Sequence, residues 1–477
     1  MAWLLITALL VRLFAHSGAS MIEPDLCSTS CECLQGLPFV VECKNDDLSQ
    51  IPHLEAEPYP FEWALFFDVN KISKITAMPT TDNLILLSFN DNPILEIEDM
   101  AFANLTKLRR LTLKQCSLTG DVFTLDAFKG PRNEEDGADP LPLEYLDVSH
   151  NDIQSLGDHA FRHFDNLKTL IISDNPFHDF DDTTSKAFGE LIGVQTLDLS
   201  RVQIKRIPEK FFSRMRQLKE LILAGNNFMV VPDEVNYIQS LERLVLDNNP
   251  IKVLSKNDKS YFHGPSQLSQ LHLSYMPDLN KIDAEAFYNL DNLKVVTISY
   301  NPNLNFIHKM AFASSGIHLK KVHLNNNNLA VLDNELLDWA ALEEIDIQNN
   351  PWVCDCRIVW FTKEPLENLN ANKPQLTEYI ICAKPNDATG QSLPYLASHD
   401  YAFKCPEIEK VTNPYYYGPL IVTTIFVGAL LLLSATVLCT YVLYQKSRSS
   451  GFSGTTVQYR RADFSNNLES IAENVYA

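Results

Sequence analysis

The residue types that most often do chemistry in enzymes do not form a catalytic motif in this sequence. It holds no GxSxG nucleophile elbow, no HExxH zinc helix, no phosphate-binding P-loop and no GxGxxG dinucleotide fingerprint. A nucleophile beside a base, or a paired acid and base, is not visible either. We therefore predict a protein that is not an enzyme and needs no cofactor.

One segment, DFDDTTSKAFGE, approaches a calcium-binding loop. It places Asp179, Asp181 and Glu190 at loop positions 1, 3 and 12, where carboxylates bind Ca²⁺. The glycine that such a loop needs at its sixth position is replaced by Thr184. Phe188 also belongs to an apolar pattern that recurs along the chain. We therefore expect no metal site here.

The ten cysteines fall into two groups of four and two single residues, Cys116 and Cys439. A CxC spacing occurs in both groups and resembles that of zinc ligands. In an oxidising compartment, however, small cysteine-rich segments are stapled by disulfides, and no histidine falls in step with these cysteines. We predict disulfide-stapled segments. The two groups are Cys27, Cys31, Cys33 and Cys43, and Cys354, Cys356, Cys382 and Cys405.

Between these groups the pattern LxxLxLxxNxL returns about every 23 to 27 residues. The segment LEYLDVSHNDI fills it completely. A period of this length with this template predicts a leucine-rich-repeat solenoid, an α/β horseshoe with a parallel sheet on its concave face. A degenerate twelfth unit begins at Glu62, and the eleven clear units begin at Leu84, Leu108, Leu143, Leu167, Val194, Leu218, Leu241, Leu268, Leu293, Leu319 and Leu342.

The repeat makes physical demands that can be checked. Each unit begins with a short strand whose alternate apolar residues point into a core shared with its neighbours. The Asn amide pairs backbone groups that would otherwise be buried without partners. Cys116, Val202 and Met276 replace this Asn. Because Val and Met cannot pair a backbone group, we expect loosened or water-filled turns at those two places.

The far side of each repeat carries a second apolar set, and its aromatic members should stack at the back. These are Phe102, Phe161, Phe287 and Phe312. One gap between repeats, from Leu108 to Leu143, is 35 residues long and contains the acidic stretch PRNEEDGADP. Insertions of this kind cost little, because loop-closure entropy grows slowly with length. We expect a mobile loop, with a ligand contact as the alternative.

Two apolar runs flank this region. The run WLLITALLV near the start, followed by SGAS, is typical of a secretory signal peptide. The second run, residues 420–444, has no charge and is long enough to cross a bilayer core of about 30 Å. Lys446 and Arg448 follow it and favour a cytoplasmic C-terminus. We predict a type I single-pass protein of the plasma membrane.

The net charge of the chain is −21, with +1 from residues 1–20 and +1 from residues 445–477, so residues 21–419 carry −23. This charge argues against nucleic acid as a ligand and favours a basic or calcium-rich partner surface.

The repeats and the motif NPWVCDC resemble the extracellular leucine-rich-repeat proteins with cysteine-rich N- and C-terminal caps. The resemblance covers roughly residues 27–405. It implies disulfides between Cys27 and Cys33, Cys31 and Cys43, Cys354 and Cys382, and Cys356 and Cys405. The boundaries we predict are 1–20 for the signal peptide, 21–52 for the N-terminal cap, 53–350 for the repeats, 351–406 for the C-terminal cap, 407–419 for a linker, 420–444 for the transmembrane helix and 445–477 for the tail.

We place the ligand-binding surface on the concave face, where apolar and aromatic residues occupy outward-facing strand positions or adjoin them. Exposed clusters of this kind mark protein interfaces. The predicted contact residues are Ile171, Ile222, Val245, His272, Tyr275, Thr297, Tyr300 and His323. Asn104 begins a glycosylation sequon that we expect on the convex back or a turn.

The resemblance implies a cell-surface recognition or adhesion protein that binds an extracellular or cell-surface protein ligand. An auxiliary subunit that modulates a channel or receptor in the same membrane is the alternative. Homodimerisation is left open. The terminus, Val475, Tyr476 and Ala477, is similar to a PDZ ligand, which binds by strand addition.

Overall fold

The computed structural model describes residues 27, 31–54, 61–81, 83–131, 139–313, 315–406 and 418–448. The chain divides into two compact units, Met1–Cys405 and Pro406–Ala477. The predicted signal peptide, the PDZ-like terminus and most of the acidic insertion lie outside the described residues.

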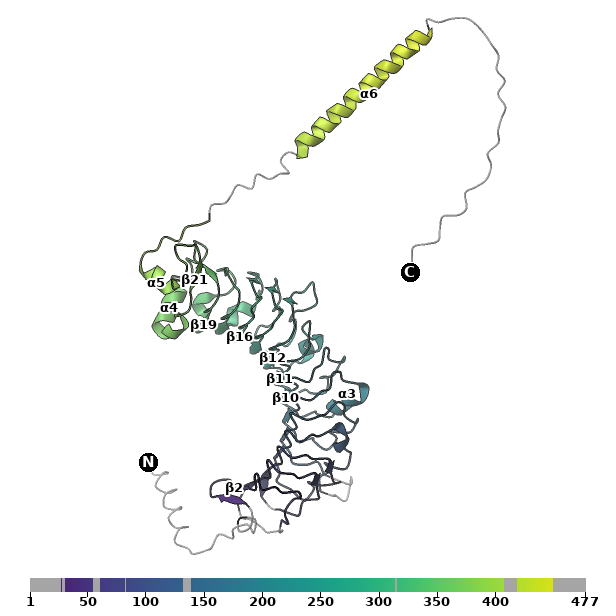
Figure 1. Cartoon of the computed structure of the whole chain (residues 1–477), viewed down its shortest axis with the longest axis vertical. Coiled ribbons are helices and arrows are strands. Elements are labelled where there is room, and N and C mark those ends of the chain that lie inside the picture. Colours follow the sequence, from purple (N-terminus) through teal and green to yellow (C-terminus); the bar gives the residue numbers. More distant parts are fainter. Residues whose placement is uncertain are drawn as a thin grey trace, which may run out of the picture. The chain divides into compact units, whose positions relative to one another are not determined.

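The first unit is a solenoid whose main sheet lines its concave side (Figure 1). Among the described residues this sheet has fourteen strands. Only the first pair, in the N-terminal cap, is antiparallel, and the following strands pair in parallel. In spatial order they are β1 (Glu32–Leu34), β2 (Phe39–Glu42), β3 (Trp63–Phe66), β5 (Leu84–Ser88), β7 (Arg110–Thr112), β8 (Tyr145–Asp147), β9 (Thr169–Ile171), β10 (Thr196–Asp198), β11 (Glu220–Ile222), β12 (Arg243–Val245), β14 (Gln270–His272), β16 (Val295–Thr297), β18 (Lys321–His323) and β19 (Glu344–Asp346).

Twelve of these strands, β3 to β19, are the twelve predicted repeats, including the degenerate one at Glu62. The solenoid fold is therefore confirmed. Away from the main sheet lie three small sheets. They are β4 (Lys74–Ile75) with β6 (Glu96–Ile97), β13 (Val253–Leu254) with β15 (Lys281–Ile282) and β17 (Phe306–Ile307), and β20 (Trp352–Val353) with β21 (Cys382–Lys384).

Helices are short and lie outside the main sheet in the first unit. Over the ranges that the structure describes, the α-helices whose bounds are defined in this unit are α3 (Asp182–Phe188), α4 (Glu364–Asn372) and α5 (Leu393–Ser398). The 3₁₀ turns are η1 (Gly120–Val122), η2 (Asp233–Tyr237), η3 (Ser315–His318), η4 (Trp339–Ala341) and η5 (Pro374–Leu376).

The Asn of each repeat forms a ladder that joins neighbouring turns. Asn249 is fully buried and donates to the carbonyls of Leu223 (3.0 Å) and Leu246 (2.8 Å). Its Oδ1 accepts the amide of Phe228, one repeat earlier, at 3.2 Å. The side chain of such an Asn therefore forms hydrogen bonds with the backbone of its own turn and of the turn before it. These bonds keep buried backbone groups paired.

The ladder shows that the prediction of loosened turns at Val202 and Met276 is wrong. Both side chains are fully buried. The amide of Val202 donates to Oδ1 of Asn226 (3.1 Å), and that of Met276 donates to Oδ1 of Asn301 (2.8 Å). Because the Asn of the following repeat reaches back, one missing Asn does not open a turn.

Cys116 takes over the donor role of the Asn it replaces. Its Sγ lies 3.1 Å from the carbonyl oxygen of Phe89 and 3.3 Å from that of Lys114. The thiol is free and buried, and this burial raises its pKa to about 12. A buried neutral thiol of this kind acts as a small packing group with a weak donor.

The predicted phenylalanines are buried, and stacked rings run along the back of the solenoid. Phe287 and Phe312 stack with centroids 4.5 Å apart, and Phe161 contacts Phe188 at 5.5 Å. The 35-residue gap also contributes, because its Phe128 stacks on Phe102 at 5.6 Å. Part of that insertion is therefore core, and the mobile-loop prediction falls on residues 132–138, outside the described residues.

Both ends of the solenoid are closed by disulfide-linked caps. The four disulfides join Cys27 to Cys33, Cys31 to Cys43, Cys354 to Cys382 and Cys356 to Cys405, as the resemblance implied. Trp352 is fully buried under the C-terminal cap, and its indole donates to the carbonyl of Ile347 at 3.0 Å.

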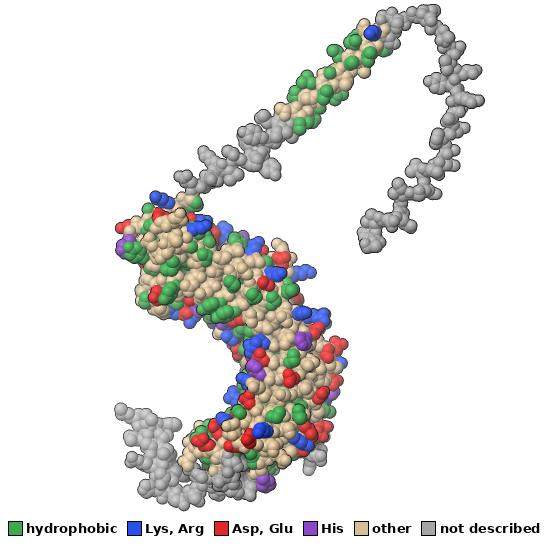
Figure 2. All heavy atoms as spheres, viewed as in Figure 1, with side chains coloured by type: hydrophobic (Ala, Val, Ile, Leu, Met, Phe, Trp, Pro, Cys, Tyr) green, Lys and Arg blue, Asp and Glu red, His purple; other side chains and the backbone are tan. Residues whose placement is uncertain are grey.

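The described part of the second unit is the helix α6 (Gly418–Arg448). Its segment Thr423–Lys446 is long and apolar enough to cross a membrane. Figure 2 shows side chains along this helix that are mostly apolar, with a basic residue at its far end. The basic residues of the last turn are Lys446 and Arg448.

Candidate protein-binding face

The strand register places the predicted outward-facing column in one line across the concave sheet. Ile171 pairs with Asp198, Asp198 with Ile222, and Ile222 with Val245. The line continues through His272, Thr297 and His323 on the next strands. Seven neighbouring strands therefore bring one of these side chains each within reach of one ligand, at the strand spacing of about 4.8 Å.

Val245 corrects one part of that prediction. Its side chain is only 7% exposed, whereas Ile171 and Ile222 are half-buried. Val245 is shorter than the residues that flank it in the register, Ile222 and His272. Val245 is therefore covered by its neighbours on the concave face. The prediction that its side chain is exposed for a ligand is wrong.

Tyr275 and Tyr300 form an aromatic pair at the edge of this face. Their rings stack with centroids 4.7 Å apart and planes 8° apart. The side chains are 55% and 45% exposed. An exposed stacked pair offers a flat, rigid, amphipathic surface of the kind found at binding interfaces.

These tyrosines occupy a position that is left-handed in every one of the twelve repeats. The residue just before the ladder position has φ between 53° and 68° throughout. This conformation turns its amide toward the next repeat, so Tyr275 donates to the carbonyl of Ser299 at 3.0 Å. The residues are Val69, Asp91, Gln115, His150, Asp174, Arg201, Gly225, Asn248, Tyr275, Tyr300, Asn326 and Asn349.

Gly225 is explained by the close approach of the preceding repeat, because the other repeats adopt the left-handed conformation with residues other than glycine. A Cβ at Gly225 would lie 2.6 Å from Cγ of Arg201, which belongs to the preceding repeat. The guanidinium of Arg201 points to Asp174 in the repeat before it. Its Nε and one terminal nitrogen donate hydrogen bonds to the two carboxylate oxygens of Asp174, at 2.6 Å and 2.5 Å. His150 lies 3.2 Å from the same carboxylate. Sequence reasoning missed this charged cluster because the left-handed position that assembles it has no fixed residue type.

The histidines of the face differ in their surroundings. His272 has its pKa lowered to about 4, by burial first and then by Arg243 and His323. Among the described residues its Nε2 has no hydrogen-bond partner. His323 instead lies 2.8 Å from Glu344. His272 is therefore a neutral imidazole whose Nε2 is buried without a hydrogen-bond partner in the described part of the chain.

The acidic residues of the face are held by neighbouring strands. Asp198 and Asp247 have their pKa values raised by burial. Asp198 accepts hydrogen bonds from Ser200, and Asp247 accepts the amide of Ser274 at 2.7 Å. Glu220 pairs with Arg243 at 2.8 Å. The face is thus a rigid mixture of charge and apolar surface.

The calcium-like segment is built differently from a metal loop. Asp181 caps α3 by accepting the amide of Thr184 at 2.7 Å. Asp179 pairs with Arg206 at 2.8 Å. Over the described ranges, no group of three or more His, Cys, Asp or Glu side chains is arranged to hold a metal ion.

Asn104, the predicted glycosylation site, is exposed and follows the buried Phe102 at the back of its repeat. Its Nδ2 donates to the carbonyl of Met78 at 2.8 Å. The side chain is therefore fixed on the side opposite the main sheet.

Two family models of leucine-rich repeats match parts of the solenoid. A model described as leucine rich repeat matches residues 192–251, and one described as BspA type leucine rich repeat region matches residues 255–377. Lumican of Homo sapiens is 30% identical over 232 residues, which are 46% of this chain. The match spans 65% of lumican, just under two thirds of its length.

A second relative aligns over most of the chain. Trophoblast glycoprotein of Mus musculus is 23% identical over 434 residues, covering 88% of this chain and 78% of that protein. Among solved structures, the Toll–Spatzle complex of Drosophila matches with a TM-score of 0.45 and 19% identity, covering 70% of this chain and 53% of the other.

Proposed function

Because the chain belongs to the extracellular leucine-rich-repeat proteins with cysteine-rich caps, we propose that it is a cell-surface recognition protein that binds an extracellular protein ligand through its concave face. In this proposal α6 crosses the plasma membrane with the solenoid outside. The eight cap cysteines, all in disulfides, support an oxidising surrounding for the solenoid.

The observation that carries the proposal is the stacked, exposed pair of Tyr275 and Tyr300. A left-handed conformation costs a non-glycine residue roughly 1–2 kcal/mol, and large side chains rarely adopt it. Neighbouring repeats use Asn at this position, in Asn248, Asn326 and Asn349. Two adjacent, stacked tyrosines at this position keep aromatic surface in solvent, which favours a binding role over a folding role.

The half-buried Ile171 and Ile222 extend the apolar part of the surface toward the centre of the sheet. Around them lie charges of both signs. We propose that the tyrosine pair anchors the ligand, that the isoleucines fill its apolar centre, and that His272, Thr297 and His323 supply polar contacts. Interfaces of this composition, an apolar centre with a polar rim, are typical of protein partners.

The proposal is tested with a multivalent probe of residues 21–413 screened against displayed cell-surface proteins. Once a partner is found, Ile222→Asp combined with Tyr300→Asp should abolish binding while surface expression of the full chain stays unchanged. Undiminished binding by that variant would reject the concave face as the site.

The auxiliary-subunit alternative places the contact in the membrane instead. Replacing residues 420–444 with an unrelated membrane helix separates the two functions. A recognition protein keeps its ligand binding after this exchange, whereas an auxiliary subunit loses its effect on the channel or receptor beside it.

A further inference from the structure

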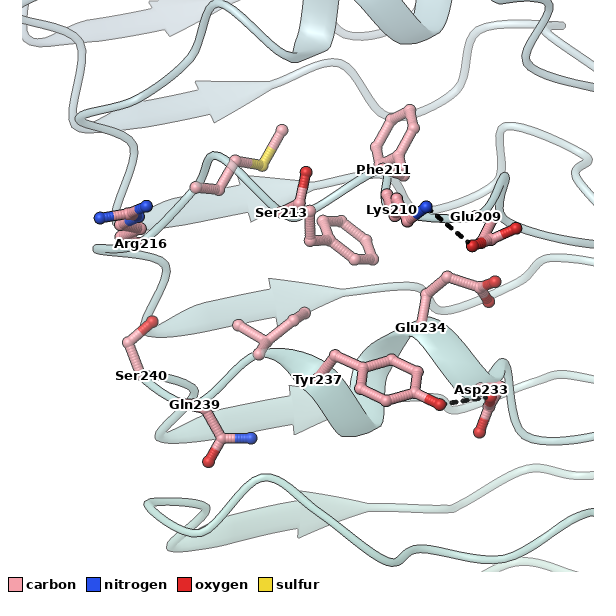
Figure 3. Close-up of a pocket in the computed structure, with 13 residues that line it drawn as sticks. Glu209, Lys210, Phe211, Ser213, Arg216, Asp233, Glu234, Tyr237, Gln239 and Ser240 are labelled. Atoms are coloured by element: carbon pink, nitrogen blue, oxygen red, sulfur yellow. Dashed lines mark hydrogen bonds and ion pairs between the residues drawn. The ribbon is translucent and has the colours of Figure 1, made fainter.

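A pocket of about 600 Å³ lies on the back of the solenoid, away from the main sheet. It is formed by the back segments of two consecutive repeats, residues 209–216 and 233–240 (Figure 3). Its size falls within the range of about 300–1,000 Å³ that is usual for ligand pockets. Nothing in the repeat pattern singled out this place.

The pocket lies where the aromatic stack is interrupted. Phe180 stacks on Phe211 at 5.0 Å, and Phe211 contacts Phe212 at 5.1 Å. The stack resumes at Phe262, which faces Phe287 at 5.9 Å. The repeat between carries aliphatic residues at the back, Val235 and Ile238 among them, and these fill less space than phenylalanine rings.

The floor of the pocket is apolar and rigid. Phe212, Met215 and Ile238 line it and are 6%, 1% and 4% exposed. Tyr237 forms a wall, and its hydroxyl donates to Asp233 at 3.1 Å. Because the ring of Tyr237 is fixed at its tip, the wall is in place before any ligand arrives. Preorganisation of this kind lowers the cost of binding.

The charges around the pocket are arranged at its two ends. Figure 3 shows Glu209, Asp233 and Glu234 at one end and Arg216, Gln239 and Ser240 at the other. Lys210 pairs with Glu209 at 3.2 Å, and His263 lies 2.9 Å from Asp233.

Glu234 remains without a cation. No ion pair to it occurs among the described residues. Burial raises its pKa, and the charges of Asp233 and Glu209 add to this effect. A half-buried carboxylate in such a place is stabilised by a cation brought from outside.

We infer that this pocket is a second protein-docking site, which takes a segment of a partner that carries an apolar side chain beside a lysine or arginine. The apolar side chain packs on Phe212, Met215 and Ile238, and the cation pairs with Glu234. Such a segment matches the net charge of −23 on residues 21–419. A fatty acid or anionic lipid would instead bring its charge close to three carboxylates.

The test uses the full chain in lipid nanodiscs and a peptide array. Each peptide places Leu, Phe or Trp next to Lys, Arg, Ser or Glu. Peptides with Lys or Arg should bind at least tenfold more tightly than their Ser counterparts. Glu234→Lys should reverse this order in favour of the Glu peptides, and Tyr237→Ala should weaken all of them.

Three controls separate an effect at the pocket from effects of net charge, of the concave face and of misfolding. Glu367→Lys makes the same charge change on the exposed side of α4 and should leave binding unchanged. Tyr275→Asn with Tyr300→Asn alters the concave face and should also leave peptide binding at the pocket unchanged. A failure of the pocket proposal can therefore be told apart from a failure of the concave-face proposal. The thermal midpoint of each variant confirms that it folds.

The inference is overturned if no peptide class binds above its Ser counterpart, or if binding ignores the charge beside the apolar residue. It is also overturned if Glu234→Lys and Tyr237→Ala both bind peptides as the parent protein does.

Discussion

The rings of Tyr275 and Tyr300 lie parallel and 4.7 Å apart, one repeat from each other, and both residues have a left-handed backbone. The regular turn of the solenoid sets this spacing, since neighbouring residues of the left-handed column stand one strand apart. The same position carries Asn in three other repeats, Asp in two, and Gly, Val, Gln, His and Arg in one each. The backbone conformation is thus the same in all twelve repeats, whereas the side chains that it presents differ.

The Asn ladder should dominate the stability of the repeats. Asn249→Ala leaves two buried carbonyls and the amide of Phe228 without this partner. Each unpaired group costs about 1–3 kcal/mol, so we expect a loss of about 3 kcal/mol or more in the free energy of unfolding. Denaturant unfolding measures it. Asn248→Gly, at the exposed left-handed neighbour, serves as the control and should change stability by less than about 0.5 kcal/mol.

The thiol of Cys116 should be protected by the fold. Its pKa is raised from 9.0 to about 12, which lowers the thiolate fraction at pH 8 roughly a thousandfold. In a Cys439→Ser background, iodoacetamide should label the native protein very slowly and label the unfolded protein quickly. Mass spectrometry counts the modified thiols. Rapid native labelling at Cys116 would show that its turn opens.

The C-terminal cap should loosen in acid through Glu344. Hydrogen bonds from Lys373 and His323 lower the pKa of Glu344 from 4.5 to about 2, against the opposing effect of burial. A carboxylate with a lowered pKa stabilises the folded state above its unfolded pKa, and this stability is lost as the pH falls from about 4.5 to about 2.

Glu344→Gln should therefore be less stable than the parent by about 1–3 kcal/mol at pH 7 and equal to it near pH 2. Thermal unfolding at a series of pH values measures the difference. Glu343→Gln, whose exposed side chain lies 3.7 Å from Lys320, is the matched control and should give a small difference at every pH. A gap between Glu344→Gln and the parent that stays constant with pH would contradict the assignment.

The sequence predicts the fold because the repeat is redundant. The segment LEYLDVSHNDI fills the pattern completely, and even the degenerate unit at Glu62 forms the strand Trp63–Phe66. The cap disulfides followed from the resemblance, because four cysteines alone allow three pairings. Where the pattern failed, at Val202 and Met276, the mistake was to treat each turn as independent, whereas Asn226 and Asn301 reach back from the next repeat.

The candidate surfaces were only partly predictable. The column containing Ile222 follows from strand alternation, but the burial of Val245 depends on the sizes of its neighbours in the register. The left-handed backbone of Tyr275 depends on a turn conformation that has no fixed residue type. The pocket beside Tyr237 arises where a ring is absent from a stack, and a missing side chain leaves no motif.

The central claim is that Tyr275 and Tyr300 serve binding and not folding. Tyr275→Asn with Tyr300→Asn places at both positions the residue that neighbouring repeats carry there. We predict a thermal midpoint that is unchanged or higher, because Asn tolerates the left-handed conformation better than Tyr. Binding of the variant probe of residues 21–413 to the partner found by the screen should fall at least tenfold. Tyr288→Asn, at an exposed tyrosine beside the buried Phe287 on the back, is the matched control and should bind like the parent. Undiminished binding by the double variant would contradict the account.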